Sequence, residues 1–360
     1  MLSLKSPISN VTKNGPTNRS KRIVVAVTAS STLLERVAHL ADDGKPYFNL
    51  IPNNGRWPKG IPPVMGGHLM DSGVVSPISV SKGAGVEITP HQFQYPTSEG
   101  HATINIANSK TEVSQLIAKT IFESAKAAID SKGSFCLVLS GCSVPNHLDA
   151  LSTIGGIDWS KVYVFFLDER IVPLTDAESH YHQIKTSLFS KVPIPTDNIF
   201  AISEGLSAKE SATNYEGRLL QVPKSILPRS ADGAFPVFDL VLLGCGVEGR
   251  FGSMFPNCPQ LAVKDKWVVS VEKAAKPPAQ RIALSLPVIN AAKEVLFVVL
   301  GGHKAEIVER VLETQSLPGS LPAQLVRPSS GRLQWLLDTE SSRNLHLKDW
   351  GNAKRFPRSE

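Results

Sequence analysis

The chain has 360 residues, of which 42% are hydrophobic and 19% charged, so its composition is that of a globular protein and excludes wholesale disorder. Its formal net charge of +6 is spread along the sequence, without a Lys/Arg run of the kind that tracks nucleic-acid phosphates. No stretch approaches the roughly 20 apolar residues of a membrane-spanning helix. We therefore expect neither a nucleic-acid partner nor a membrane span.

The four cysteines form no Cys-x-x-Cys pair, and no His follows them at zinc-finger spacing. This pattern favours a protein without a metal site and without a disulfide framework, in a reducing compartment.

Residues 1–29 have the composition of a targeting segment. The first acidic residue is Glu35, and five basic residues precede it among many Ser, Thr and Asn residues. Acid-poor, basic and hydroxyl-rich N-termini are typical of organelle transit peptides. We predict a transit peptide and a plastid location. The cytoplasm is the alternative, because Ile23–Ala29 could equally form a first β-strand.

Residues 30–109 are rich in Pro and Gly, with eight prolines between Pro46 and Pro96. Proline excludes long helices and central strands, so we predict an extended arm. The arm also holds aromatic residues such as Trp57 and Phe93, which are depleted in disordered chains. It therefore either packs on its own domain or anchors the chain to a protein partner.

Residues 110–345 alternate between helical and strand patterns. Apolar residues recur at helical spacing from Val113 to Ile129, and Gly133 then ends the helix. Further helices are expected at 208–220 and 304–312. Predominantly apolar runs, the signature of strands buried on both faces, occupy 135–139, 162–167, 238–243 and 295–300. The pattern predicts an α/β fold, a doubly wound and mostly parallel sheet with helices on both faces, followed by a polar tail at 346–360.

Ligands of such sheets bind at the carboxyl ends of the strands, where backbone N–H groups face anions. The loops after the apolar runs, which combine Gly or Pro with polar groups, span 140–145, 168–173, 244–256 and 301–304. This composition suits a phosphate group or sugar hydroxyls.

Several motifs carry a family resemblance, among them Leu139-Ser-Gly-Cys-Ser143, Phe166-Leu-Asp-Glu-Arg170 and Lys276-Pro-Pro-Ala-Gln-Arg281. With Leu286-Pro-Val-Ile-Asn290 and Leu333-Gln-Trp-Leu-Leu-Asp338, they resemble the 6-phosphogluconolactonase family, most closely its plant members, over residues 110–345. The resemblance implies the fold that this family shares with glucosamine-6-phosphate deaminase. It also implies hydrolysis of 6-phosphogluconolactone to 6-phosphogluconate, in the oxidative pentose phosphate pathway, without a metal or other cofactor.

By motif position, the resemblance assigns substrate or phosphate contacts to Ser140, Gly141, Ser143, Asp168, Arg170, Lys276 and Arg281. Lys276 and Arg281 form a cationic pair suited to a phosphate, Arg as a two-pronged donor and Lys as a point charge. The expected ligand is therefore a phosphorylated sugar lactone or another small anion.

The general base of the family is missing. Arg250 stands where the family carries a His, and a guanidinium with a pKa above ~12 has no lone pair to take a proton from water. Activity is then expected to be weak or lost. Two alternatives follow: a relocated base, supplied by His180, His182 or His303, or a silent homologue that serves as a non-enzymatic subunit of a larger assembly. Amino-sugar phosphate deamination, a sister activity, depends on the same His position and is disfavoured.

Overall fold

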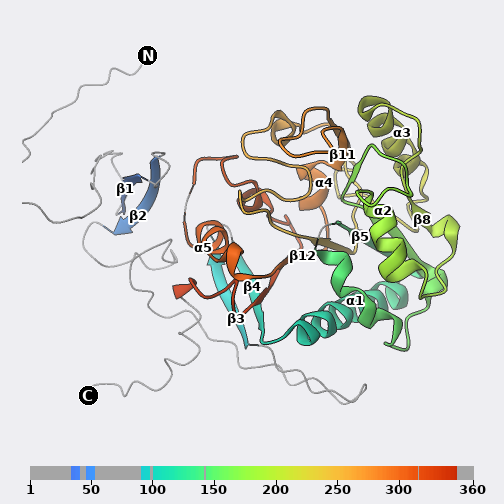
Figure 1. Cartoon of the computed structure of the whole chain (residues 1–360), viewed down its shortest axis with the longest axis horizontal. Helices are drawn as coiled ribbons and strands as arrows, with labels where there is room; N and C mark the ends of the chain where they lie inside the picture. The colour runs from blue at the N-terminus through green and yellow to red at the C-terminus, as the bar shows by residue number, and fades with distance from the viewer. Residues whose placement is uncertain are drawn as a thin grey trace, which may run out of the picture.

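The computed structural model describes residues 34–40, 46–52, 91–97, 100–141, 143–314 and 316–346 (Figure 1). The predicted transit peptide, most of the predicted arm and nearly all of the predicted tail lie outside these residues. Strands β1 (Leu34–Leu40) and β2 (Pro46–Pro52) pair with each other as a two-stranded antiparallel sheet. Among the described residues, no helix has the length and apolar character needed to cross a bilayer.

The main sheet has eight strands in the order β3-β4-β13-β12-β9-β5-β6-β8. Their bounds are His91–Thr97, Gly100–Ala107, Arg332–Asp338, Glu294–Val299, Leu240–Leu243, Phe135–Leu139, Val162–Phe166 and Ile199–Phe200. All neighbouring pairs are parallel except β3 with β4, which is antiparallel at the edge. The predicted α/β fold with a mostly parallel sheet is confirmed.

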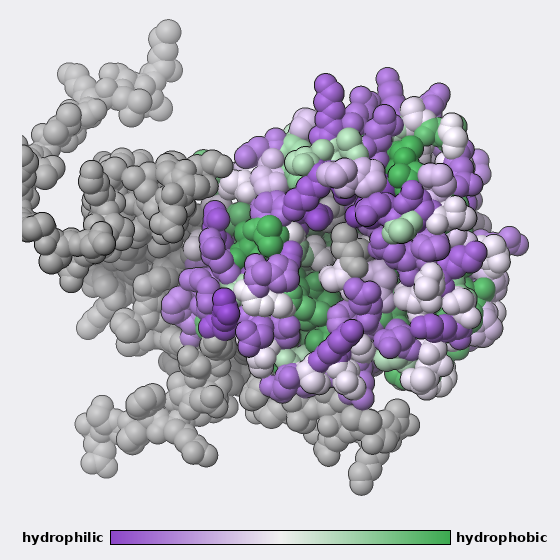
Figure 2. Space-filling view, viewed as in Figure 1, coloured by the Kyte–Doolittle hydropathy of each residue, from purple (hydrophilic) through white to green (hydrophobic). Residues whose placement is uncertain are grey.

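Each central strand buries side chains on both faces of the sheet. In β5, Phe135, Leu137 and Leu139 join one apolar cluster, while Cys136 and Val138 join the other. This alternation follows from the two-residue period of a strand, and it explains why β5 is apolar at every position. With the apolar side chains enclosed in two layers, the face in Figure 2 is mostly polar with small apolar patches.

Helices cover both faces, as predicted. α1 (Lys110–Lys132) and α2 (His180–Ile184) pack in the cluster that contains Leu137. α3 (Ala208–Gln221), α4 (Leu286–Asn290) and α5 (Ala305–Glu313) pack in the cluster that contains Val138.

The long helix α1 has defined ends. The Ser109 side chain accepts a hydrogen bond from the Glu112 backbone N–H at the first turn. Gly133 adopts a left-handed conformation with φ of 79° just after the last turn, which glycine tolerates best. These signals fix where the helix begins relative to the carboxyl end of β4.

The sheet extends N-terminal to residue 110, where the sequence placed the start of the domain. β4 pairs in parallel with β13, and its residues Ala102, Ile104 and Ile106 are buried in the core. β3 pairs with β4. The last part of the predicted arm therefore packs on its own domain as two strands.

The strand order reverses direction between β5 and β9. From β5 the chain proceeds outward to β6 and β8, and from β9 it proceeds outward in the other direction to β12 and β13. Helices consequently leave these two neighbouring strands toward opposite faces, which makes this position the switch point at which open parallel sheets bind ligands. The strand-end rule therefore predicts a ligand site beyond the carboxyl ends of β5 and β9.

A second, three-stranded antiparallel sheet flanks this edge, in the order β10-β11-β7. Its strands are Val268–Val271, Arg281–Leu284 and Asp168–Arg170. Arg281 pairs with Arg170, and Ala283 pairs with Asp168. This pairing brings two predicted site motifs, about a hundred residues apart in sequence, side by side.

Candidate functional site

The loops that follow β5 and β9 lie close together. A Cβ atom added to Gly244, the first residue after β9, would lie 3.6 Å from the Oγ of Ser143. Ser140, directly after β5, is buried, and its Oγ has no hydrogen-bond partner among the described residues. An unsatisfied buried hydroxyl at a strand end is unusual and marks a polar position that a ligand can use.

Gly141 lies against the imidazole ring of His180. An added Cβ would be only 1.8 Å from His180 Cδ2 and 2.3 Å from Nε2, so no side chain fits there. His180 itself is 1% exposed. The ring therefore forms one wall of the Ser140–Gly141 turn.

Asp168 connects His180 to the loop after β9. The His180 Nδ1 lies 2.7 Å from the backbone carbonyl oxygen of Asp168 and 3.4 Å from its Oδ1. On the other carboxylate oxygen, Asp168 accepts a 2.7 Å hydrogen bond from Ser253 Oγ. All three side chains are buried, so Asp168 is a structural link between the two halves of the site.

The buried carboxylate of Glu169 holds the start of α2. It accepts hydrogen bonds from the backbone N–H groups of Arg170, His180 and Tyr181 and from the Ser179 hydroxyl. A carboxylate at the first turn of a helix satisfies amides that have no partner within the helix. This arrangement fixes the backbone of His180 and so directs its ring toward Gly141.

Arg250 is held by its own loop. Its Nε donates to Glu248 Oε1 at 3.1 Å, and Nη1 donates to the Gly252 carbonyl at 2.6 Å. The guanidinium lies over the Phe255 ring, 5.2 Å from the ring centre. The side chain is 17% exposed, so a fixed cation occupies this loop.

Lys276 joins Arg250 through a shared carboxylate, because its Nζ lies 3.0 Å from Glu248 Oε1. Burial alone would raise the pKa of Glu248. The hydrogen bond from Lys276 and the charges of Arg250 and Lys276 outweigh burial and lower that pKa. Glu248 is therefore an ionised anion between two cations.

Lys304 is a cation to which sequence reasoning assigned no role, although its loop was identified as a strand-end loop. Its Nζ donates to the Cys245 carbonyl at 2.8 Å. Burial lowers the pKa of Lys304, and the charges of Arg250 and Lys276 act in the same direction, while Glu248 opposes them. Burial also raises the pKa of the neighbouring Cys245 thiol to about 12, which leaves it protonated and a poor nucleophile.

Arg281 and Arg170 face the protein rather than open space. Arg281 is 3% exposed and donates to the carbonyls of Lys276, Pro277 and Pro278. Arg170 donates to the carbonyl of Glu178 and lies 3.6 Å from its carboxylate. The Arg281 contacts position the turn that carries Lys276, so in this structure Lys276 is the more accessible member of the predicted pair.

The three His candidates for a relocated base differ in position. His180 contacts Gly141 and Asp168. His303 is exposed and lies near Gly301, in the loop after β12. The His182 backbone N–H donates to Ser179 Oγ within the first turn of α2. The imidazole that the structure brings against the predicted site residues is that of His180.

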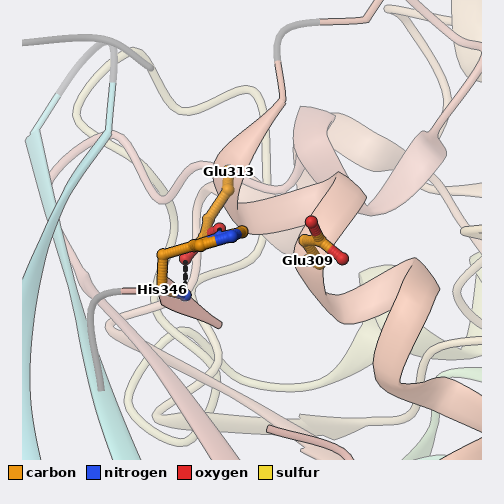
Figure 3. A group of neighbouring side chains, drawn as sticks. All are labelled: Glu309, Glu313 and His346. Atoms are coloured by element: carbon orange, nitrogen blue, oxygen red, sulfur yellow. Dashed lines mark hydrogen bonds and ion pairs between the residues drawn. The ribbon is translucent and has the colours of Figure 1, made fainter. Parts of the chain in front are cut away.

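Within the described part of the chain, one group could hold a metal ion, formed by Glu309 and Glu313 of α5 and by His346 (Figure 3). Their ligand atoms lie within 4.8 Å of one another. Both carboxylate oxygens of Glu313 already accept hydrogen-bond contacts from His346, one from its backbone N–H and one from Nδ1. These contacts hold the segment after β13 against α5, which explains why the three side chains lie together.

Comparison with known proteins identifies relatives along the described domain. The family model for glucosamine-6-phosphate isomerases/6-phosphogluconolactonase matches residues 108–335. A probable 6-phosphogluconolactonase 1 of Arabidopsis thaliana is 38% identical, over 69% of this chain and 96% of the relative. The chloroplastic 6-phosphogluconolactonase 3 of the same plant is 37% identical, over 68% of this chain and 78% of the relative.

A solved structure supports the same family fold. The 6-phosphogluconolactonase of Trypanosoma brucei is similar with a TM-score of 0.59 and 26% identity, over 68% of this chain and 98% of that one.

Proposed function

Because the chain belongs to the glucosamine-6-phosphate isomerase/6-phosphogluconolactonase family, we propose that it binds 6-phosphogluconolactone or its acid and hydrolyses the lactone weakly or not at all. The observation that carries this proposal is the guanidinium of Arg250, fixed in the loop after β9 by Glu248 and Gly252. By motif position, the family has its base His there.

Lactone hydrolysis needs a group that takes a proton from the attacking water. A guanidinium stays protonated at every physiological pH and offers no lone pair. Loss of a general base costs ~10²- to 10⁴-fold in rate. Arg250 is held in this loop by contacts to Glu248 and Gly252, so the residue at the position of the family base cannot act as one.

Binding is expected to survive, because the site keeps an excess of positive charge. Arg250 and Lys276 contact the carboxylate of Glu248, and Lys304 lies within its electrostatic reach. An incoming phosphate can take hydrogen bonds from these cations in exchange for those of Glu248, and charge-assisted bonds are the stronger kind. The unsatisfied Ser140 hydroxyl adds a neutral donor for the sugar.

His180 is the competing candidate for the base, but its surroundings favour a positioning role. A general base must reach the reacting water within hydrogen-bond distance. The His180 side chain is 2% exposed, its ring lies against Gly141, and its Nδ1 is directed at Asp168. In this arrangement, the ring is buried and its Nδ1 is already engaged.

The test compares the wild-type chain with Arg250→His, with Arg310→His as a matched control. Arg310 is an exposed Arg on α5, remote from this loop in the sequence. Lactone hydrolysis is followed directly, and binding of 6-phosphogluconate is followed by calorimetry. We expect wild type to bind the acid and to hydrolyse the lactone at least ~10²-fold more slowly than a family enzyme assayed beside it. We expect the activity to rise about tenfold in Arg250→His and to stay unchanged in Arg310→His.

If wild type hydrolyses the lactone at the rate of the family enzyme, the proposed loss of activity is wrong. If the His180→Gln substitution then abolishes this hydrolysis, His180 is the base. If wild type does not bind 6-phosphogluconate, the proposal that the site still binds its ligand is wrong.

The alternative of a non-enzymatic assembly subunit depends on residues 30–109. Of this segment, β4 belongs to the main sheet and β3 pairs with it, so only the portion before β3 is available as an anchor. The alternative predicts that the native protein elutes with partners well above its own 38.9 kDa. A lone monomer contradicts it.

We also propose a plastid location, supported by the acid-poor composition of residues 1–29 and by relatives named chloroplastic. Other plant relatives carry no such name. Imaging of the chain with a fluorescent protein at its C-terminus checks the proposal, and a purely cytoplasmic signal contradicts it.

A further inference from the structure

The carboxylate of Glu248 is an anion that the protein itself holds at the candidate site. Its Oε1 accepts a hydrogen bond from Arg250 Nε at 3.1 Å and lies 3.0 Å from Lys276 Nζ. Lys304 is close enough for its charge to interact with Glu248. Carboxylates and phosphates bind the same charge-assisted donors. Glu248 therefore uses the contacts that the proposed function assigns to the phosphate of a ligand.

The loop is built so that the Glu248 side chain folds back over its own turn. Backbone hydrogen bonds close this turn, from the Gly246 N–H to the Arg250 carbonyl at 2.8 Å and from the Gly249 N–H to the Gly246 carbonyl at 2.9 Å. Gly246 provides the space, because an added Cβ would lie 2.7 Å from Glu248 Oε2 and 2.6 Å from Arg250 Cγ. The position of the carboxylate thus depends on a glycine beneath it.

The carboxylate is only half satisfied in this position. Glu248 Oε2 is buried and has no hydrogen-bond partner among the described residues. A buried acceptor without a donor costs free energy, more so when it is charged. The side chain is 24% exposed and so already borders solvent. Glu248 would therefore regain hydration on both oxygens if it moved outward.

Both cations keep other supports when Glu248 leaves. Arg250 Nη1 still donates to the Gly252 carbonyl. The turn that carries Lys276 is still held by Arg281, whose guanidinium donates to the Lys276 carbonyl. Departure of Glu248 consequently frees one N–H of Arg250 and the ammonium of Lys276, without removing the contacts that position them.

We propose that Glu248 is an internal competitor for the phosphate of the ligand: its carboxylate occupies the anion position, and the phosphate binds when this carboxylate moves into solvent. This inference rests on the proposed function, which supplies a phosphorylated ligand at the site. When a site is open in only a fraction of the molecules, its apparent affinity falls by that fraction. Removal of the carboxylate should therefore tighten binding, whereas a residue that positions the cations for the ligand would weaken binding when it is removed.

The test measures the binding of inorganic phosphate and of 6-phosphogluconate to the full chain by calorimetry, in wild type and in Glu248→Gln. Glutamine keeps the size of the side chain and removes its charge. We expect Glu248→Gln to bind both probes about tenfold more tightly. Glu123→Gln is the matched control, because Glu123 is an exposed glutamate of α1 in an ion pair with Lys119. Binding is expected to stay unchanged in this control.

Thermal melting checks that each variant folds. If Glu248→Gln does not fold, Glu248→Asp replaces it, because its shorter side chain draws the carboxylate away from the cations. We expect Glu248→Asp to bind phosphate more tightly than wild type, by a smaller factor than Glu248→Gln.

The competition is overturned if the folded Glu248 variant binds phosphate no more tightly than wild type, or if Glu123→Gln gains as much affinity. Weaker binding in Glu248→Gln would instead assign Glu248 a positioning role. If wild type does not bind 6-phosphogluconate but Glu248→Gln does, the competition is supported, while the binding that the proposed function expects of wild type is wrong.

Discussion

At Gly141 the backbone of the first strand-end loop runs directly against a buried side chain. A methyl group there would overlap the His180 ring. Asp168 holds this ring, and Glu169 holds the His180 backbone N–H. The ring cannot turn away without losing these contacts. Glycine is therefore required by space at this position.

Gly141→Ala is predicted to destabilise the protein by about 1 to 3 kcal/mol, the usual cost of overpacking a filled site. Chemical denaturation measures the change. Gly155→Ala is the matched control, because a Cβ added there meets nothing within 4 Å, and we expect a change within about 0.5 kcal/mol. Equal stability of both variants would contradict the fixed position of His180.

The individual site residues show which features of the site can be predicted from motif position and which cannot. Ser140, Gly141 and Asp168 lie together at the strand ends, where the strand-end rule predicts a site. The direction of Arg281 was not predictable, because it depends on the three carbonyls of the turn at 276–278. The part played by Lys304 could have been inferred from its strand-end loop, but its link to Cys245 depends on tertiary contacts.

Among the elements, the long ones were predicted closely. The expected helices at 208–220 and 304–312 are α3 at Ala208–Gln221 and α5 at Ala305–Glu313. The β10-β11-β7 sheet was missed because strands of three or four residues carry no readable period. β4 did carry a signal, the alternation of Ala102, Ile104 and Ile106, which the surrounding Pro and Gly content obscured.

A prediction at this scale concerns Gly217, inside α3. A Cβ added there meets nothing within 4 Å, so the substitution brings no clash. Alanine in a helix interior is favoured over glycine, and Gly217→Ala should stabilise the protein by about 0.5 to 1 kcal/mol. Thermal and chemical denaturation measure the gain. Destabilisation instead would show that α3 is not a regular helix around this residue.

For the whole molecule, the position of β4 predicts where the chain can be shortened. A chain that begins at Lys110 lacks the strand that pairs with β13 and loses the buried side chains of Ile104 and Ile106. Each such side chain contributes about 1.5 to 3 kcal/mol when buried, a large share of a typical domain's stability.

We therefore expect a chain of residues 110–346 to be insoluble or to melt far below a chain of residues 91–346, which keeps both edge strands. Soluble expression and thermal melting compare the two. Equal melting temperatures would show that β4 is dispensable.

By itself, the sequence determined the class of the fold, and it predicts the edge of the sheet where a ligand would bind and the loss of the expected base at Arg250. These features depend on residue type and on short-range periodicity, which are written in neighbouring positions. Tertiary structure alone decided that His180 lies against Gly141 and that β4 completes the sheet. It also decided that Glu248 joins Arg250 to Lys276. Most of these contacts join residues far apart in the chain. Their geometry follows from strand order and from the packing that directs each side chain.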